Sequence, residues 1–177
     1  LTGEIRDRDA ELLVDYKNGK GETGVLLGVN ARPLFEGHGK GNGIAFTLIP
    51  ENPIVAFQRF HFNENHNWIY LHKNMRVYAN VDMWDEEGMG FRVHSVPGDT
   101  VSLQNIDVEI RRIRLQEITS VLPYFPEITG LFSLEAHYIQ TEKDLQLSAE
   151  ASVDELTYER QRIGDVALGA TWLPGEQ

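Results

Sequence analysis

The side chains that could do chemistry in this chain begin with six histidines, three of which lie close together at His61, His66 and His72. Histidine zinc sites use tight and recognisable spacings, such as the HExxH pattern on a helix. Intervals of five and six residues match no such pattern, so the sequence predicts structural or surface roles for these histidines. The chain has no cysteine, which excludes disulfides, thiolate metal ligands and cysteine nucleophiles.

Other catalytic or ligand-binding patterns are present only in part. No spacing among the 27 acidic residues singles out a glycosidase pair. The glycine-rich run Glu36–Gly43 lacks the order of a phosphate-binding loop, and no helical pattern follows it. The basic cluster Arg111–Arg114 is expected to pair with its acidic neighbours Asp107, Glu109 and Glu117. With no Gly-x-Ser-x-Gly motif either, we expect a protein that is not an enzyme and that holds no cofactor or metal.

The charge and length of the chain narrow the class of protein further. Its 177 residues carry a formal net charge of −11, from 16 basic and 27 acidic side chains. This balance argues against nucleic acid as a partner, because phosphates need a basic surface. No run approaches the roughly 20 apolar residues of a membrane helix. Since the chain starts at Leu1 without a leader, we expect residues 1–177 to be a single internal fragment of a longer protein.

The element that must position any functional surface is the β-strand, and its clearest case is the stretch Asp144–Asp154. Leucine, alanine and valine alternate there with polar residues over the whole length. Such strict alternation predicts a strand with one apolar and one wet face, about 35 Å long at roughly 3.3 Å per residue. A strand of this kind lines either a packed core or a groove for an apolar ligand.

The same alternation recurs along the chain, which predicts ten to twelve strands. It is found at residues 25–31, 55–62, 77–84, 106–110, 132–138 and 166–172. The phase slips by one residue near Arg111 and Arg112, which indicates a β-bulge. Turns are expected at Asn18-Gly19 and at Pro97-Gly98.

One segment departs from the strand rhythm. Leu115, Ile118 and Leu122 recur at helical spacing, and Pro123 then stops the pattern. We therefore expect a helix of about two turns over Gln116–Leu122, with its Ile118/Leu122 side covering an open end or edge of the apolar layer.

Several long runs resemble the TamB family of AsmA-like envelope proteins. The resemblance covers roughly residues 51–174. It is most specific over Leu115–Phe125 (LQEITSVLPYF), over Thr129-Gly130-Leu131, and over Leu156–Leu168 (LTYERQRIGDVAL). The runs ENPIVAFQRFHF and NHNWIYLHKNMRVYANVDMWDEEGMGFRVHS add to it. These runs are typical of the family but are not catalytic motifs.

The resemblance implies an all-β fold, an elongated antiparallel sheet curled into a U with an apolar concave face and called a β-taco. It implies a periplasmic location in a bacterium with two membranes, with the parent protein anchored in the cell envelope. It also implies a part in outer-membrane biogenesis, with an outer-membrane barrel of the Omp85 type as a partner bound through other regions of the parent.

Three functions compete at this point. The first is a hydrophobic groove for phospholipid acyl chains, or another apolar ligand, moving between the inner and outer membranes. The second is a scaffold for assembly of outer-membrane β-barrel proteins, which would add a client strand to an exposed sheet edge. The third, a hydrolase in a β-sandwich, would need a polar cleft that the sequence does not show. The candidate groove lining is Ile106, Val108, Ile110, Phe132, Leu134, Ala136, Leu145, Leu147, Ala149, Val153, Val166 and Leu168.

Overall fold

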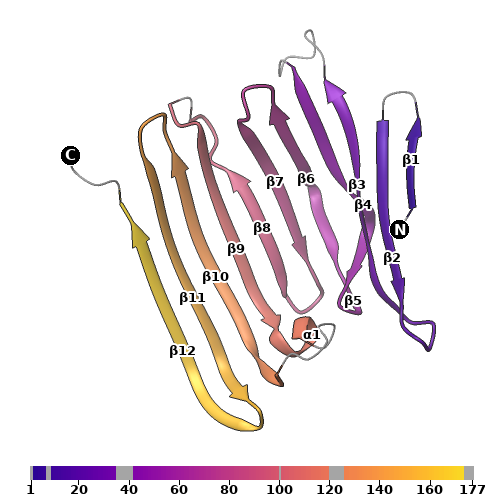
Figure 1. The fold of residues 1–177 in the computed structure, drawn as a ribbon, viewed down its shortest axis with the longest axis vertical. Coiled ribbons are helices and arrows are strands. Elements are labelled where there is room, and N and C mark those ends of the chain that lie inside the picture. The colour runs from indigo at the N-terminus through magenta and orange to yellow at the C-terminus, as the bar shows by residue number, and fades with distance from the viewer. Residues whose placement is uncertain (1, 7–8, 35–41, 100, 120–125, 174–177) are drawn as a thin grey trace. The chain divides into compact units, whose positions relative to one another are not determined.

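Antiparallel strands make up almost all of the computed structural model (Figure 1). It describes the chain except residues 1, 7–8, 35–41, 100, 120–125 and 174–177, and shows twelve strands and one short helix in the described part. The predicted all-β class, with antiparallel strands and one short helix, is confirmed. The chain divides into two compact units, a first unit Leu1–Glu86 and a second unit Glu87–Gln177.

The first unit is an open antiparallel sheet with the strand order β1-β2-β3-β4-β6-β7, to which the short β5 adds by pairing with β4. Its strands are β1 (Thr2–Arg6), β2 (Asp9–Lys17), β3 (Thr23–Leu34), β4 (Gly43–Val55), β5 (Gln58–Arg59), β6 (His61–His72) and β7 (Val77–Trp84). The predicted turn at Asn18-Gly19 joins β2 to β3. The glycine-rich run before Gly43 lies almost wholly outside the described residues.

Cross-strand pairing in the first unit brings apolar residues together on one face. Ala31 of β3 lies opposite Ala10 of β2 and Phe46 of β4, and the row continues through Ile69 of β6 to Ala79 of β7. This is the face predicted from the alternation at residues 25–31. The buried hydrophobic side chains of this unit gather around β6 and β7: Phe60, Tyr70, Ala79, Val81 and Met83.

The predicted strand over residues 55–62 is wrong in part. The chain reverses direction at Ala56 and Phe57, which have φ values of 50° and 65°. Such left-handed backbone is uncommon in residues other than glycine, so these two residue types carry no turn signal. The amide of Phe57 donates to the carbonyl of Gly24 at 3.0 Å, which ties this turn to the start of β3.

The second unit is an open antiparallel meander in the order β8-β9-β10-β11-β12. Its strands are β8 (Gly90–Ser95), β9 (Gln104–Arg114), β10 (Ile128–Gln140), β11 (Leu145–Tyr158) and β12 (Gln161–Trp172). The predicted turn at Pro97-Gly98 lies between β8 and β9. Strand β11 contains the alternating stretch that predicted a long strand, and at 14 residues it is the longest of the described strands.

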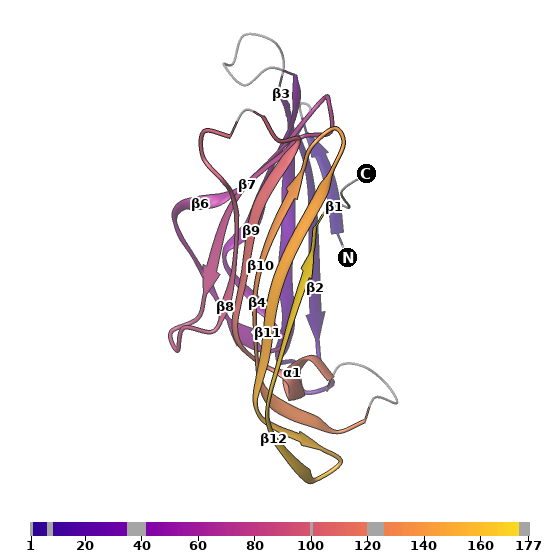
Figure 2. The ribbon, with the colours of Figure 1, turned by 90° about the vertical axis from the view of Figure 1, so that its left-hand side faces the viewer.

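Bulges bend the strands of the second unit. The predicted bulge near Arg111 and Arg112 is confirmed, because these two residues of β9 stand opposite the single residue Ser133 of β10. Arg112 takes the left-handed conformation, with φ 54°. Further register shifts occur at Thr129/Leu131 of β10 and at Val153/Leu156 of β11. Figure 2 shows that β10, β11 and β12 bend near the end of the strands that holds these last two register shifts.

The predicted short helix is present in the described residues. It runs over Leu115–Thr119 as α1 and lies against β10. The expected range Gln116–Leu122 is thus helical as far as Thr119, and its last residues lie outside the described part. The expected Ile118/Leu122 contact also concerns side chains outside the described part.

Two glycines give a matched test of backbone crowding. A Cβ at Gly28 in β3 would lie 2.2 Å from the carbonyl oxygen of Leu12, whereas a Cβ at Gly169 in β12 would have no neighbour within 4 Å. We expect Gly28→Ala to lower the free energy of unfolding by roughly 1–3 kcal/mol, because backbone must move. Gly169→Ala is expected to be neutral or slightly stabilising. Urea unfolding followed by circular dichroism measures both, and equal effects would contradict the crowding at Gly28.

The loop between β8 and β9 is organised by Asp99. Its Oδ1 accepts hydrogen bonds from the amides of Val101 and Ser102 at 2.9 and 3.0 Å, and its Oδ2 accepts one from Asn105 Nδ2 at 2.6 Å. The amide of Ser102, the side chain of Asn105 and the amide of Val101 together hold the pKa of Asp99 well below its ordinary value. The charged form is therefore the one that stabilises the loop.

We expect Asp99→Ala to lower the urea midpoint at pH 7, and Asp99→Asn to lower it less, because the amide oxygen still accepts from the two backbone N–H groups. Because the pKa of Asp99 is lower in the folded state than in the unfolded state, its charge stabilises the fold at pH values above the unfolded pKa of about 3.9. This stabilisation is lost progressively as the pH falls below that value. The difference between wild type and Asp99→Ala should therefore shrink below about pH 4. Asp144→Ala, in the exposed turn after β10, is the control. A difference that stayed constant down to pH 2 would refute the role of the charge.

Candidate apolar surface

Four rows of side chains cross the second unit on one face, which we call the apolar face. Each row is fixed by cross-strand pairing, so its members lie side by side from strand to strand. The rows are Phe91-Ile110-Leu134-Ala151-Leu168, Val93-Val108-Ala136-Ala149-Ala170, Ser95-Ile106-Tyr138-Leu147-Trp172, and Ile113-Phe132-Val153-Val166.

The register places all twelve predicted lining residues on this face. Eleven of them belong to the four rows, and Leu145 lies beside them, opposite Gln140. Sequence reasoning missed several other members of the face: Phe91, Val93, Ile113, Tyr138, Ala151, Ala170 and Trp172. Most of these lie in runs whose alternation was already visible, so extending each stripe to its end would have found them.

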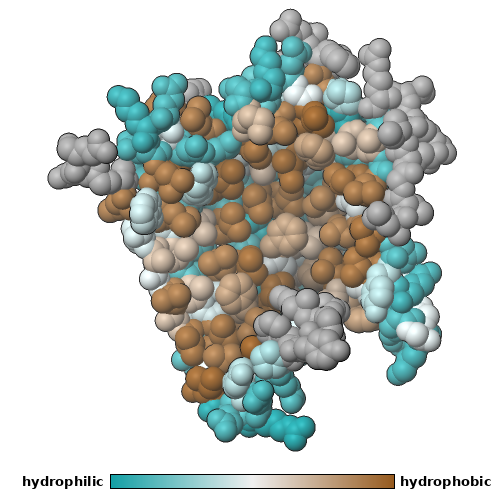
Figure 3. All heavy atoms as spheres, viewed as in Figure 1, coloured by the Kyte–Doolittle hydropathy of each residue, from teal (hydrophilic) through white to brown (hydrophobic). Residues whose placement is uncertain are grey.

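The apolar face is most open to solvent along β12, whereas its members on β8, β9 and β10 are half-buried. Leu147, Leu168 and Trp172 are 37 %, 70 % and 65 % exposed, and no member of the four rows is fully buried. Figure 3 shows apolar side chains gathered on this face over β9 to β12. Exposed apolar patches of this extent mark an interaction surface more often than a simple solvent face. The face is therefore the candidate functional site.

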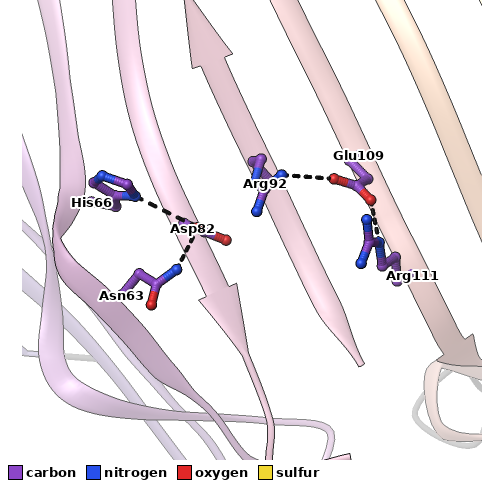
Figure 4. A network of polar contacts seen from close by, with 6 residues as sticks. All are labelled: Asn63, His66, Asp82, Arg92, Glu109 and Arg111. Atoms are coloured by element: carbon purple, nitrogen blue, oxygen red, sulfur yellow. Dashed lines mark hydrogen bonds and ion pairs between the residues drawn. The ribbon is translucent and has the colours of Figure 1, made fainter. Parts of the chain in front are cut away.

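The opposite face of the second unit is polar and charged. Glu109 of β9 accepts from Arg92 of β8 at 3.3 Å and also pairs with Arg111 (Figure 4). His137 Nδ1 lies 2.5 Å from Asp107 Oδ1 on the neighbouring strand. A shallow trough of about 660 Å³ runs over these residues. The strands thus separate charge from apolar surface, which leaves the apolar face free of ionised groups.

The basic cluster pairs mostly as predicted. Arg111 pairs with Glu109, and Arg114 pairs with Glu117 at 3.1 Å and with Glu87. The hydrogen bond that Arg114 donates to the Glu117 carboxylate raises the pKa of Arg114 above its ordinary value. Asp107 pairs with His137 instead of an arginine.

The three neighbouring histidines of the sequence all lie on β6 of the first unit and have separate surroundings. His66 Nδ1 lies 3.6 Å from Oδ2 of the buried Asp82, which also accepts a hydrogen bond from Asn63 at 2.7 Å (Figure 4). His72 Nδ1 lies 2.7 Å from Asn74 Oδ1 in the turn that follows β6. His61 begins the strand, opposite Trp84. The three histidines therefore do not form one common site.

Comparisons of the chain with family models, with curated proteins and with solved structures found no match. Within the described residues, no helix has the length and apolar character needed to cross a membrane.

The free energy of unfolding of single variants tests whether the apolar face is exposed. We expect Leu168→Ser to change the free energy of unfolding by less than about 0.5 kcal/mol, because the side chain is mostly in water already. Val81→Ala, at a position only 1 % exposed, should cost roughly 1–3 kcal/mol through lost contacts and a cavity. Urea unfolding at micromolar protein concentration measures both, and a large cost at Leu168 would mean that this face is a packed core.

Proposed function

We propose that this chain is a segment of a TamB-like envelope protein whose apolar face carries phospholipid acyl chains between the inner and outer membranes. The observation that supports the proposal most directly is the exposure of four aligned apolar rows on the second unit. Each buried methylene of a lipid tail is stabilised by about 0.8 kcal/mol, so even partial contact along the rows favours binding.

The dimensions of the face suit one acyl chain. Strands lie about 4.8 Å apart, so the four intervals from β8 to β12 span roughly 19 Å across the strands. One leaflet of a bilayer has a hydrocarbon thickness of about 15 Å, half of the ~30 Å core. A tail lying across the strands would thus contact one side chain from each strand of a row.

The smallest side chains of the apolar face over β10 to β12 belong to the row Val93-Val108-Ala136-Ala149-Ala170. Its alanines lie between bulkier neighbours, with Tyr138, Leu147 and Trp172 in one adjacent row and Leu134 and Leu168 in the other. Tails would move along the rows without a chemical step, and headgroups would stay in water. The net charge of −11 disfavours close contact with anionic headgroups, which suits recognition through the tails alone.

This proposal includes a periplasmic location and no enzymatic activity. The parent protein would be anchored in the envelope, and an Omp85-type outer-membrane barrel would bind through regions outside this chain. These statements depend on the sequence resemblance to the TamB family.

A second candidate function is a scaffold for outer-membrane β-barrel assembly. It would use an antiparallel sheet of the kind seen here, because a client strand adds to an open sheet edge by backbone pairing. Acyl chains would use the face of the sheet, whereas a client strand would use its edge, so the two functions predict different contacts.

Site-specific photocrosslinking in the full-length parent protein in cells separates these functions. A benzophenone amino acid replaces Leu147, which lies on the apolar face between Tyr138 and Trp172. The matched control replaces Gln146, the next residue in β11, which lies on the opposite face.

We expect phospholipid adducts at Leu147 and none at Gln146. Lipid adducts at both positions would indicate nonspecific contact with a membrane and refute the groove. Protein adducts at Leu147 would refute the lipid groove and favour protein binding at this face, and no adduct there would indicate a closed structural face.

A further inference from the structure

The turn between β2 and β3 begins with an asparagine followed by a glycine, Asn18-Gly19. The amide of Gly21 donates to the backbone carbonyl of Asn18 at 3.0 Å, and the amide of Asn18 donates to the backbone carbonyl of Glu22 at 2.9 Å. Residues 19–22 are exposed. The turn is therefore closed by defined hydrogen bonds and is reached by solvent.

The side-chain amide of Asn18 is held at both of its polar atoms. Its Oδ1 accepts hydrogen bonds from the amides of Lys20 and Glu22 at 2.9 and 3.0 Å, and its Nδ2 donates to Glu22 Oε2 at 2.7 Å. Two N–H groups directed at one carbonyl oxygen polarise that carbonyl and stabilise negative charge on it, as an oxyanion hole does. The carbonyl carbon of this side chain, Cγ, is thus activated toward a nucleophile.

The backbone nitrogen of Gly19 lies beside this polarised carbonyl. The ring closed by the hydrogen bond from Lys20 to Oδ1 contains both the Gly19 nitrogen and the Asn18 Cγ, so these two atoms are held close together. Within the part of the chain that the structure describes, the Gly19 amide donates no hydrogen bond, and a Cβ at Gly19 would have no neighbour within 4 Å. Nothing there prevents this amide from losing its proton and attacking Cγ.

We propose that Asn18 is a self-modification site, at which the Gly19 nitrogen displaces the side-chain amide of Asn18 as ammonia. The proposal is independent of the lipid function. Solvent takes the proton of the Gly19 N–H, the nitrogen bonds to Cγ, and the electron pair of the C=O bond moves onto Oδ1 between its two N–H donors. The bond from Cγ to Nδ2 then breaks, and Nδ2 takes a proton from water as it leaves. A water molecule opens the resulting succinimide to aspartate or isoaspartate, so the net reaction consumes one water and releases one ammonia.

A second Asn-Gly pair in the first unit, Asn42-Gly43, lacks these features. Gly43 begins β4 and is paired with both β3 and β6. A Cβ at Gly43 would lie 2.3 Å from the carbonyl oxygen of Leu71, so the backbone there is enclosed. Ring closure at this pair would have to disturb two strand pairings. The fold therefore favours reaction at Asn18 over reaction at Asn42.

The modification would weaken the closure of the turn between β2 and β3. A carboxylate oxygen would replace the Nδ2 donor, which places two like charges where a hydrogen bond of 2.7 Å joins Asn18 to Glu22. The isoaspartate product also adds one carbon to the backbone between Asn18 and Gly19. We expect Asn18→Asp, which reproduces the aspartate product, to unfold at a lower urea concentration than the wild type.

The test is peptide mapping by mass spectrometry after the whole chain has been incubated at pH 8 in heavy-oxygen water, both folded and in urea. Each modified asparagine keeps a labelled oxygen from the solvent, which identifies the site. We expect Asn18 to react at least as fast in the folded protein as in urea. Asn42 should react at least about tenfold more slowly in the folded protein than in urea, because its reacting atoms are held apart.

Gly19→Ala is the matched control. The open space around Gly19 accommodates a methyl group, so the urea midpoint should not change. The methyl group crowds the attacking nitrogen, so modification of Asn18 should slow by at least about tenfold.

Three results would overturn the proposal. Slower reaction of Asn18 in the folded protein than in urea would mean that the turn protects this side chain. Equal rates at Asn18 and Asn42 in the folded protein would mean that the fold does not select the site. A rate at Asn18 that Gly19→Ala leaves unchanged would exclude the Gly19 nitrogen as the nucleophile.

Discussion

The surface properties of the second unit depend on the register of its antiparallel strands. Side chains alternate between the two faces of a strand, so a slip of one residue would move every apolar side chain of that strand to the charged face. The pairing of Ala136 with both Val108 and Ala149 shows how the register aligns one row over three strands. Without that alignment, the apolar residues would be divided between the two faces.

Bulges are compatible with this constraint because they absorb extra residues locally. In β9, Ile110 and Ile113 both belong to the apolar rows although three positions separate them, and the left-handed Arg112 takes up the extra residue. In β11, Glu155 has a similar conformation with φ 53°, and its amide is bound by Asp165 of β12. Each bulge bends its strand while keeping the side-chain phase on both sides of it.

The separation of charge from apolar surface gives the second unit two distinct faces. Arg92 and Arg111 both pair with Glu109, which places these charges together on the polar face. The apolar face has no such groups and is only partly covered by the chain itself. Burial of that surface by a ligand or partner would be favourable at about 25 cal/mol per Å². This free energy is what a passive lipid path would use.

Periodicity in the sequence was sufficient to predict the strand content, the bulge near Arg112 and the shared face of the twelve lining residues. Alternation is a local property and survives any tertiary arrangement. The reversal at Ala56 and Phe57 was not predictable in this way, because left-handed backbone at two non-glycine residues is held by surrounding contacts such as the bond from Phe57 to Gly24. The helical spacing of Leu115, Ile118 and Leu122 predicted a helix from Gln116, one residue after its observed start at Leu115.

The sequence by itself determined which residues can share a face, because each strand's pattern is fixed by the two-residue period of extended backbone. It could not determine which strands are neighbours or which faces remain open, because these depend on pairing between residues far apart in the chain. Only the tertiary structure showed that Leu147 and Trp172 are adjacent and exposed, that Asp82 is buried beside Asn63, and that β12 has a single partner among the described strands. The physical reason is that exposure and edge position follow from long-range contacts, whereas alternation follows from backbone geometry alone.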